Sequence, residues 1–260
     1  MKIASWNVNS LKVRLPQVLD WINLNQPDVL CLQETKQNNG NFPHDIFEQK
    51  GFFSYHNGQN TYNGVAIISN KELIDVQFDI SNFHDEQKRL ISGIYPNNEG
   101  PKFRVISAYI PNGQSLNSDK FEYKINWLKS FISSLQKKID GIENIITGDF
   151  NIAPTKLDCY DSKSWDGKIL VSPQEREYFD KLLNLGFIDT FREMNPYANE
   201  FSWWDYRIPF KRNLGMRIDH ILLSKNLLTF LKKAYIDKTT RTLERPSDHV
   251  PVVTELSLNP

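Results

Sequence analysis

The stretch that decides the fold reads Asn144-Ile145-Ile146-Thr147-Gly148-Asp149-Phe150-Asn151-Ile152-Ala153-Pro154. It begins with a short apolar run, and a run of this length that ends at a glycine and polar residues predicts a buried strand. Asp149 and Asn151 follow directly, so a carboxylate and an amide stand at the end of that strand. The same pattern recurs along the chain.

Apolar runs of strand length are spread over all 260 residues. We predict strands at Ile3–Val8, Val29–Leu32, Val65–Ser69, Leu90–Tyr95, Phe103–Ile110, Asn144–Gly148, Ile218–Leu223, Ala234–Ile236 and Val252–Leu256. Glycine and proline are dispersed between them, and no low-complexity linker or repeat divides the chain. We therefore expect a single domain over residues 1–260.

Two segments repeat apolar residues at helical spacing. The first repeats at Leu11, Leu15, Val18 and Ile22. The second repeats at Phe121, Ile125, Leu128, Ile132, Leu135 and Ile139. We interpret the second stripe as core packing and expect Asp119 and Glu122 to form its N-terminal capping pair.

A third helix is predicted from its end signals. Ser172 is a favourable N-cap, Pro173 fits the first helical position, Glu175 completes a capping box, and Gly186 is a suitable stop. The strands outnumber the helices, which excludes a strict βαβ barrel. We expect a layered α/β fold, largely antiparallel, with helices outside.

Composition sets the remaining bounds. Hydrophobic residues make up 40% and charged residues 24%, which is typical of a globular protein. The chain has no apolar run of membrane-spanning length, and its N-terminus turns polar too soon for a signal peptide. Cys31 and Cys159 cannot form a disulfide framework, so we expect a reducing compartment, with Cys31 in the core.

Polar side chains border several of the predicted strands. They are Asn7, Asn9, Gln33, Glu34, Tyr109, Asp149, Asn151, Asp219, His220, Asp248 and His249. Each of them alone is readily explained as a turn or cap residue. In antiparallel neighbours, however, the end of one strand lies beside the start of the next, so these positions can meet on one rim.

The chemistry of that rim favours a hard divalent cation. Carboxylates and amides are oxygen ligands that suit Mg²⁺ or Mn²⁺, and zinc-type Cys/His spacing is absent from the sequence. The sequence also lacks a Walker-type phosphate loop and a Gly-x-Ser-x-Gly elbow. A metal beside a water-activating Asp and a donating His can hydrolyse a phosphodiester.

Six motifs in order then resemble one family. They are Ser5–Asn9, Leu32–Lys36, Ala108–Gly113, Gly148–Pro154, Arg217–Leu223 and Ser247–Pro251. Together they are similar to the motif series of the exodeoxyribonuclease III family of apurinic/apyrimidinic (AP) endonucleases. Cys159–Asp161 and Phe201–Arg207 resemble segments of its bacterial branch. The resemblance implies a DNase I-like four-layer αββα sandwich, with two mixed sheets face to face and helices outside.

The resemblance also implies the activity. It is Mg²⁺-dependent hydrolysis of DNA phosphodiesters in base excision repair, with Mn²⁺ as a substitute. The expected reactions are incision 5′ of abasic sites, 3′→5′ exonuclease action and removal of 3′ blocking groups on duplex DNA. We expect no membrane partner, a monomer, and a cytoplasmic location at the nucleoid.

Site residues are carried over motif by motif. Glu34 is implied as the main metal ligand, with Asn7 close to it and Asp248 as a further carboxylate on the metal side. An amide at Asn9, which is Asp in some relatives outside this branch, would weaken any second metal position.

The resemblance implies catalytic roles for five residues. Asp149 would activate the attacking water and Asn151 would orient it, while Tyr109 would contact the scissile phosphate. His249 would stabilise the developing charge, with Asp219 fixing and polarising its imidazole.

A pocket for the extruded abasic sugar is expected from Asn112, Trp203, Met216 and Ile218. Met216 stands where some relatives carry Trp. Trp203 and Trp204 would face opposite ways on a strand, and we expect Trp203 to face DNA.

The other histidines match no catalytic role. We expect His44, His56 and His84 at the surface or in loops, and His220 to be structural because its side chain points away from that of Asp219.

The net charge is 0, but residues 207–245 contain ten basic and three acidic residues, a segment charge of +7 that the rest of the chain balances. We interpret this segment as a basic rim that faces DNA.

Two other functions fit parts of the sequence. One is another phosphoesterase of the superfamily, acting on inositol phosphates, sphingomyelin or RNA, against which the Phe201–Arg207 segment stands. The other is a non-catalytic DNA-binding relative, which would lack Glu34, Asp149, Asp219 or His249; all four are present.

Overall fold

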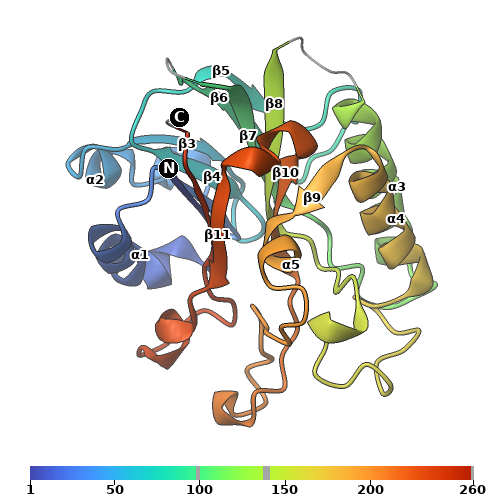
Figure 1. The fold of residues 1–260 in the computed structure, drawn as a ribbon. Coiled ribbons are helices and arrows are strands. Elements are labelled where there is room, and N and C mark those ends of the chain that lie inside the picture. The colour runs from blue at the N-terminus through green and yellow to red at the C-terminus, as the bar shows by residue number, and fades with distance from the viewer. Residues whose placement is uncertain (98–99, 137–140, 259–260) are drawn as a thin grey trace.

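A computed structural model describes residues 1–97, 100–136 and 141–258. Two six-stranded sheets lie at its centre, between helices on both outer sides (Figure 1). In spatial order, the first sheet contains β11 (Leu231–Ile236), β12 (Val252–Leu256), β1 (Lys2–Asn7), β2 (Val29–Gln33), β4 (Val65–Ser69) and β3 (Phe53–Asn57). The second contains β5 (Ile74–Phe78), β6 (Leu90–Tyr95), β7 (Lys102–Tyr109), β8 (Ile142–Asp149), β10 (Asp219–Ser224) and β9 (Phe187–Asp189).

Both sheets are mixed. The pairs β1–β2 and β7–β8 are parallel, and the other neighbours are antiparallel. The α-helices are α1 (Leu11–Asn25), α2 (His44–Glu48), α3 (Asp119–Leu135), α4 (Pro173–Asn184) and α5 (Thr190–Met194). Short 3₁₀ helices are η1 (Asn39–Asn41), η2 (Lys156–Asp158), η3 (Phe210–Arg212), η4 (Lys225–Phe230) and η5 (Lys238–Thr242). Within the described ranges, no helix is both long and apolar enough to cross a membrane.

The molecule has three apolar layers, one between the two sheets and one between each sheet and its helices. They explain why the central strands are continuous apolar runs in the sequence. Ile145 of β8 lies in the core between the two sheets, whereas its neighbour Ile146 packs under α3 and α4 with Trp127. On the other side of the molecule, Trp21 of α1 packs against Leu30 of β2. A strand that is covered on both faces needs apolar residues at successive positions, which is the pattern that predicted the strands. The expected four-layer α/β sandwich is confirmed.

The predicted strands all exist; three have the predicted bounds, and the ends of the others differ by at most three residues. Three strands were not predicted: β3, β5 and β9. β3 and β5 lie at sheet edges and β5 is largely exposed, so neither shows an apolar run. β9 has only 3 residues. Edge and very short strands bury too little to leave a pattern in the sequence.

The helix ends confirm one cap prediction and correct another. Ser172 and Glu175 form the predicted capping box of α4, and Gly186, with φ of +97°, follows that helix. The N-cap of α3, however, is Ser118, whose hydroxyl accepts from the Phe121 N–H, while Asp119 and Glu122 lie in the first turn. Their charges oppose the partial positive charge of the helix start, but Ser118 makes the capping bond. Ile139 lies outside the described residues.

The loop assignment of His56 is wrong. His56 lies in β3, is 6% exposed, and stacks on Phe42 with ring centroids 4.2 Å apart. Its Nε2 is 2.8 Å from the hydroxyl of Thr35. An aromatic ring with one polar edge packs well when that edge finds a partner. Cys31 is buried in the core between the sheets, as expected.

Candidate active site

Most of the predicted polar residues meet at one edge of the sandwich, where strands from both sheets end, but Gln33 bonds to Ser5 and Ser107 in the interior and His220 bonds to Arg217. Tyr109 closes β7 and is paired with Asp149 at the end of β8, and Asp149 is paired in turn with Asp219 at the start of β10. Asn7 ends β1 in the facing sheet. The β1–β8 contact between the two sheets therefore brings residues from both into one site.

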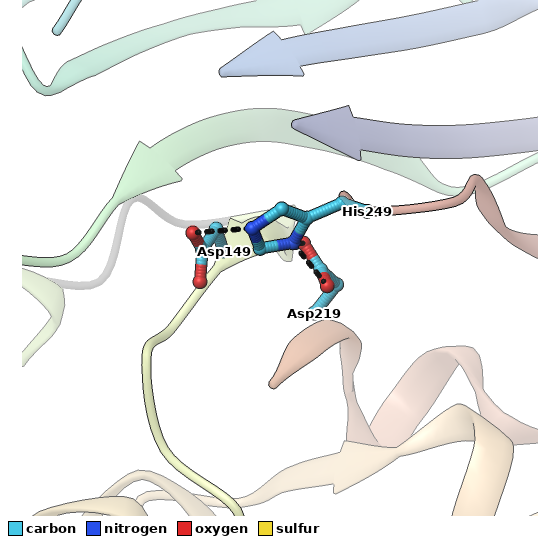
Figure 2. A group of neighbouring side chains, drawn as sticks. All are labelled: Asp149, Asp219 and His249. Carbon is cyan, nitrogen blue, oxygen red and sulfur yellow. Dashed lines mark hydrogen bonds and ion pairs between the residues drawn. The ribbon is translucent and has the colours of Figure 1, made fainter. Parts of the chain in front are cut away.

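A hydrogen-bonded pair of Asp219 and His249 forms the centre of this site (Figure 2). The Nδ1 of His249 lies 2.8 Å and 3.0 Å from the two carboxylate oxygens of Asp219. Burial by itself would lower the pKa of His249, but the negative charges of Asp219 and Asp149 outweigh it and raise the pKa to about 10. His249 is therefore an imidazolium at neutral pH, with its Nε2–H available on the other side of the ring.

Asp149 faces that free edge of the imidazolium. Its Oδ2 lies 3.7 Å from His249 Nε2 and accepts a hydrogen bond of 2.9 Å from the Asn7 side-chain amide. Its Oδ1 accepts from the backbone N–H of Asn151 at 2.9 Å. Burial raises the pKa of Asp149 to about 7; the charge of His249 opposes this shift, and the charges of Asp219 and Glu34 add to it. A carboxylate with this pKa is suited to accept a proton near neutral pH.

Glu34 lies on the far side of Asn7. The Asn7 amide donates to Glu34 Oε1 as well as to Asp149, at 2.9 Å in each case. Tyr109 donates its hydroxyl to the same Oε1 at 2.9 Å, and Lys36 pairs with Oε2 at 3.0 Å. Burial and the charge of Glu34 raise the pKa of Tyr109 well above its ordinary value, so Tyr109 is a neutral phenol. Glu34 has a φ of +52°, uncommon for a side chain of this size.

The donor set fits a divalent cation. The carboxylates of Glu34 and Asp149 both accept from the side-chain amide of Asn7. Asp219 adds a third negative charge, which the imidazolium of His249 offsets. Among the described residues, ligand atoms of Asp149, Asp219 and His249 lie within 4.8 Å of one another, but His249 and Asp219 are already bonded together. Glu34 with Asp149 is therefore the better cation site, because the Asn7 amide joins these two carboxylates and the cations of Lys36 and His249 offset only part of the site's three negative charges.

Two predicted metal-side residues have other partners here. Asn7 presents its NH₂ group to both carboxylates, and its oxygen accepts from the Asn9 N–H at 3.0 Å. Asp248 accepts from the Asn9 amide and from the Trp203 indole, both at 3.0 Å. Asn7 thus bridges the cation site, whereas Asp248 fixes the neighbouring wall.

Asn151 and Asn112 form a second hydrogen-bonded pair beside Asp149. The Asn112 amide donates to Asn151 Oδ1 at 2.8 Å, and the Asn151 amide donates to the Ile110 carbonyl at 3.0 Å. Asn151 has a φ of +51°, the left-handed conformation that asparagine tolerates. The turn after β8 is therefore tied to the turn after β7.

Trp203, Met216 and Ile218 pack together as expected. They belong to an apolar cluster with Ala153, Cys159, Leu170 and Val171. Met216 and Ile218 are buried, and Trp203 is half-buried with its ring 6.4 Å from that of His249. Trp204 points the other way into a separate core, as the alternation rule predicted.

The basic segment 207–245 does not act as one surface. Arg217 is only 1% exposed and pairs with Asp158 at 2.7 Å and with Asp189 at 2.8 Å. Arg207 pairs with Asp205, and Lys238 pairs with Glu200. The sequence-based rim therefore overstated the charge that this segment offers to DNA. His220 Nδ1 accepts from the Arg217 guanidinium at 3.0 Å and its Nε2–H donates to the Ile152 carbonyl at 2.9 Å, which is the structural position expected for it.

Sequence reasoning missed several supporting residues. Ser202 donates to Asp219 Oδ2 at 2.6 Å, and Ser247 donates to the Asn7 carbonyl at 2.7 Å. Arg89 lies over the ring of Tyr109, 4.7 Å from its centroid. Ser202 lies in the Phe201–Arg207 segment and Ser247 in the Ser247–Pro251 motif, so membership of these motifs could have indicated both. No sequence signal indicated Arg89.

Comparisons with known proteins agree with this architecture. The model of the endonuclease/exonuclease/phosphatase family matches residues 4–249. Exodeoxyribonuclease III of Haemophilus influenzae is 38% identical over 267 aligned positions, which cover 98% of this chain and 99% of the relative. The structure of the 3′ phosphatase NExo from Neisseria, bound to a product DNA hairpin, is similar with a TM-score of 0.95 and 43% identity, covering 99% of both chains. An AP endonuclease from Archaeoglobus fulgidus has a TM-score of 0.94 and 34% identity, again over 99% of both chains.

Proposed function

Because this chain belongs to the endonuclease/exonuclease/phosphatase family, we propose that it is a DNA-repair nuclease that hydrolyses phosphodiester bonds in duplex DNA. Its relatives are named exodeoxyribonuclease III and AP endonuclease, and one structural neighbour is a 3′ phosphatase bound to DNA. We assign to it incision 5′ of abasic sites, 3′→5′ exonuclease action, and removal of phosphate and other blocking groups from 3′ ends.

One observation carries the proposal: Asp149 faces the imidazolium of His249 across 3.7 Å, with Asp219 bonded behind the ring. A proton acceptor and a charged proton donor thus converge on one small space. A phosphoryl group that enters it would find a base on one side and a positive charge on the other.

The residues then have distinct roles in hydrolysis. The carboxylate of Asp149 accepts the proton of the attacking water as the new P–O bond forms, and the Asn151 N–H holds Oδ1 so that the carboxylate keeps its direction. The bond from phosphorus to the 3′-oxygen breaks, that oxygen leaves with the bonding electron pair and takes a proton from solvent water, and Asp149 later returns its proton to solvent. The Nε2–H of His249 donates to a non-bridging oxygen as negative charge develops there, which is worth about 10²–10³ in rate for one such donor.

Glu34 and Asp149 would hold the cation, which we propose to be Mg²⁺, with Mn²⁺ as a substitute, and the Asn7 amide would keep the two carboxylates together. When bound, it would neutralise phosphate charge and polarise a phosphoryl oxygen. Tyr109 is a neutral phenol that donates to Glu34 Oε1, so its hydroxyl can donate to the scissile phosphate once it is released from Glu34.

Substrate choice follows from the wall beside His249. Trp203 is the half-buried member of the apolar cluster that contains Met216 and Ile218, and we propose that a deoxyribose without a base lies against it. Asn112 is exposed and bonds to Asn151 beside Asp149. We propose that the protein acts as a monomer on duplex DNA with abasic sites or 3′ ends, in the cytoplasm at the nucleoid.

The test uses a duplex that carries one abasic site and a 5′ label. We expect cleavage 5′ of the lesion with Mg²⁺, and none with EDTA. A matched duplex with an ordinary nucleotide at the lesion position separates abasic incision from exonuclease action. Intact abasic DNA with both Mg²⁺ and EDTA would overturn the proposal.

A further inference from the structure

A fully buried lysine lies beside the site, and no step above uses it. Lys124 of α3 has no exposed surface, and neither does Glu175 of α4, with which it forms an ion pair. Figure 1 shows these two helices side by side against the second sheet. A lysine in such a position must have a partner for each N–H, because an unpaired buried donor is costly.

The ammonium group of Lys124 has three N–H donors, and the structure places three acceptors around it. It donates to the Glu175 carboxylate, to the Asn151 carbonyl at 2.8 Å and to the Asn112 carbonyl at 3.3 Å. The two carbonyls belong to the turns that follow β7 and β8. Lys124 is thus the point where α3, α4 and both turns are joined.

These two turns carry the asparagine pair and orient Asp149. Asn151 makes both bonds: its carbonyl accepts from Lys124, and its N–H donates to Asp149 Oδ1 at 2.9 Å. The Asn112 amide donates to Asn151 Oδ1 at 2.8 Å. A shift of either turn would therefore move the proton acceptor relative to His249.

The surroundings keep the ammonium in place. Glu175 also accepts from the N–H and hydroxyl of Ser172 and from the N–H of Leu170, so its carboxylate cannot turn away. Gly113 has a φ of +86°, and a Cβ there would lie 3.1 Å from Lys124 Cδ. The glycine thus leaves a path for the lysine side chain.

Stability alone does not account for this lysine. A buried ion pair can often be replaced by apolar residues at no cost in stability, because desolvation offsets the attraction. An apolar side chain, however, cannot donate to two backbone carbonyls and a carboxylate, as the Lys124 ammonium does. We propose that Lys124 is a positioning residue that fixes the Asn112 and Asn151 turns and, through Asn151, the carboxylate of Asp149. This rests on the proposed nuclease function of the site.

The experiment compares K124M, the neutral double variant K124M/E175Q and the control K129M, which changes an exposed lysine of the same helix. Single-turnover and steady-state cleavage of the abasic duplex are measured below the melting temperature of the least stable variant. We expect the double variant to regain much of the stability that K124M loses, because no buried carboxylate is left unpaired. Its kcat should stay about 10- to 100-fold low with KM within about 3-fold, as for a misplaced catalytic group.

The same samples give a readout that does not depend on activity. The ¹⁵N side-chain amide signals of Asn112 and Asn151 should shift in the double variant and stay in place in K129M. Inactive wild-type protein would overturn the proposed function, while these signals would still decide whether Lys124 positions the turns. Unshifted signals, wild-type kcat in K124M, or recovery of kcat together with stability would overturn the positioning role. So would failure of the neutral double variant to fold.

Discussion

Asp219 binds the Nδ1 of His249 with both carboxylate oxygens, at 2.8 Å and 3.0 Å. The partners are 30 positions apart: Asp219 begins β10 of the second sheet, and His249 precedes β12 of the first sheet. The bond therefore also links the two sheets. The geometry keeps the imidazole charged and directs Nε2 at Asp149.

Replacing Asp219 by Asn should lower the pKa of His249 and reduce kcat by about two orders of magnitude, because the donor loses its charge. D219N/H249A should be no slower than H249A, since the two residues act as a unit. NMR titration of His249 and steady-state kinetics check both points, with D20N on the exposed face of α1 as control. Additive losses in the double variant would contradict the coupling.

Asp149→Asn should abolish most turnover and leave folding and DNA binding largely intact. The substitution removes the proton acceptor but keeps the shape of a side chain that is 1% exposed. Because a buried charge is removed, we expect a melting temperature equal to or above that of wild type. Cleavage, binding of abasic DNA by fluorescence anisotropy, and thermal melting are measured together. An unfolded variant or an unchanged rate would refute the role given to Asp149.

Arg217→Met should destabilise the fold by about 3–5 kcal/mol, since it leaves the buried carboxylates of Asp158 and Asp189 without their main partner. The matched control is R207M, because the Arg207 side chain is 88% exposed and its solvent-screened pair with Asp205 should contribute little to stability. Urea unfolding measures both. Equal effects would mean that the Arg217 pair does not behave as a buried one.

The stability of the protein should depend on His220 below neutral pH. Burial, together with the charge of Arg217, lowers the pKa of His220 from 6.5 to about 4. As pH falls, the unfolded chain binds this proton first, so the stability that the neutral ring contributes is complete above pH 6.5 and is lost between 6.5 and about 4.

H220Q keeps an amide near the Ile152 carbonyl and does not titrate. The difference in unfolding free energy between wild type and H220Q should therefore shrink by about 2 kcal/mol from pH 7 to pH 5. Urea unfolding at several pH values gives this difference directly, and the comparison cancels the other titrating groups. A difference that stays constant over this range would show that His220 is protonated at the same pH in both states.

The sequence predicted those parts of the structure that depend on local pattern. Ile145 and Ile146 are both apolar because they face different buried layers, so the central strands were visible as apolar runs. The polar residues at strand ends were visible for the same reason, since they interrupt those runs. His56 was missed because a histidine in an edge strand leaves no such pattern, and only its contact with Phe42 shows that it is buried.

By itself, the sequence determined the layered α/β architecture, the set of residues gathered at one edge, and the chemistry that their types can perform. The tertiary structure alone decided what each of them contacts. Asn7 and Asp149 are 142 positions apart, yet they share a hydrogen bond, while Arg217 turned away from solvent to pair with Asp158. Local pattern reports which face of an element is buried, whereas partner choice depends on how the two sheets pack. That packing brings the imidazolium of His249 beside the carboxylates of Asp149 and Asp219. These residues are far apart in the sequence, so their spacing along the chain does not reveal the contacts.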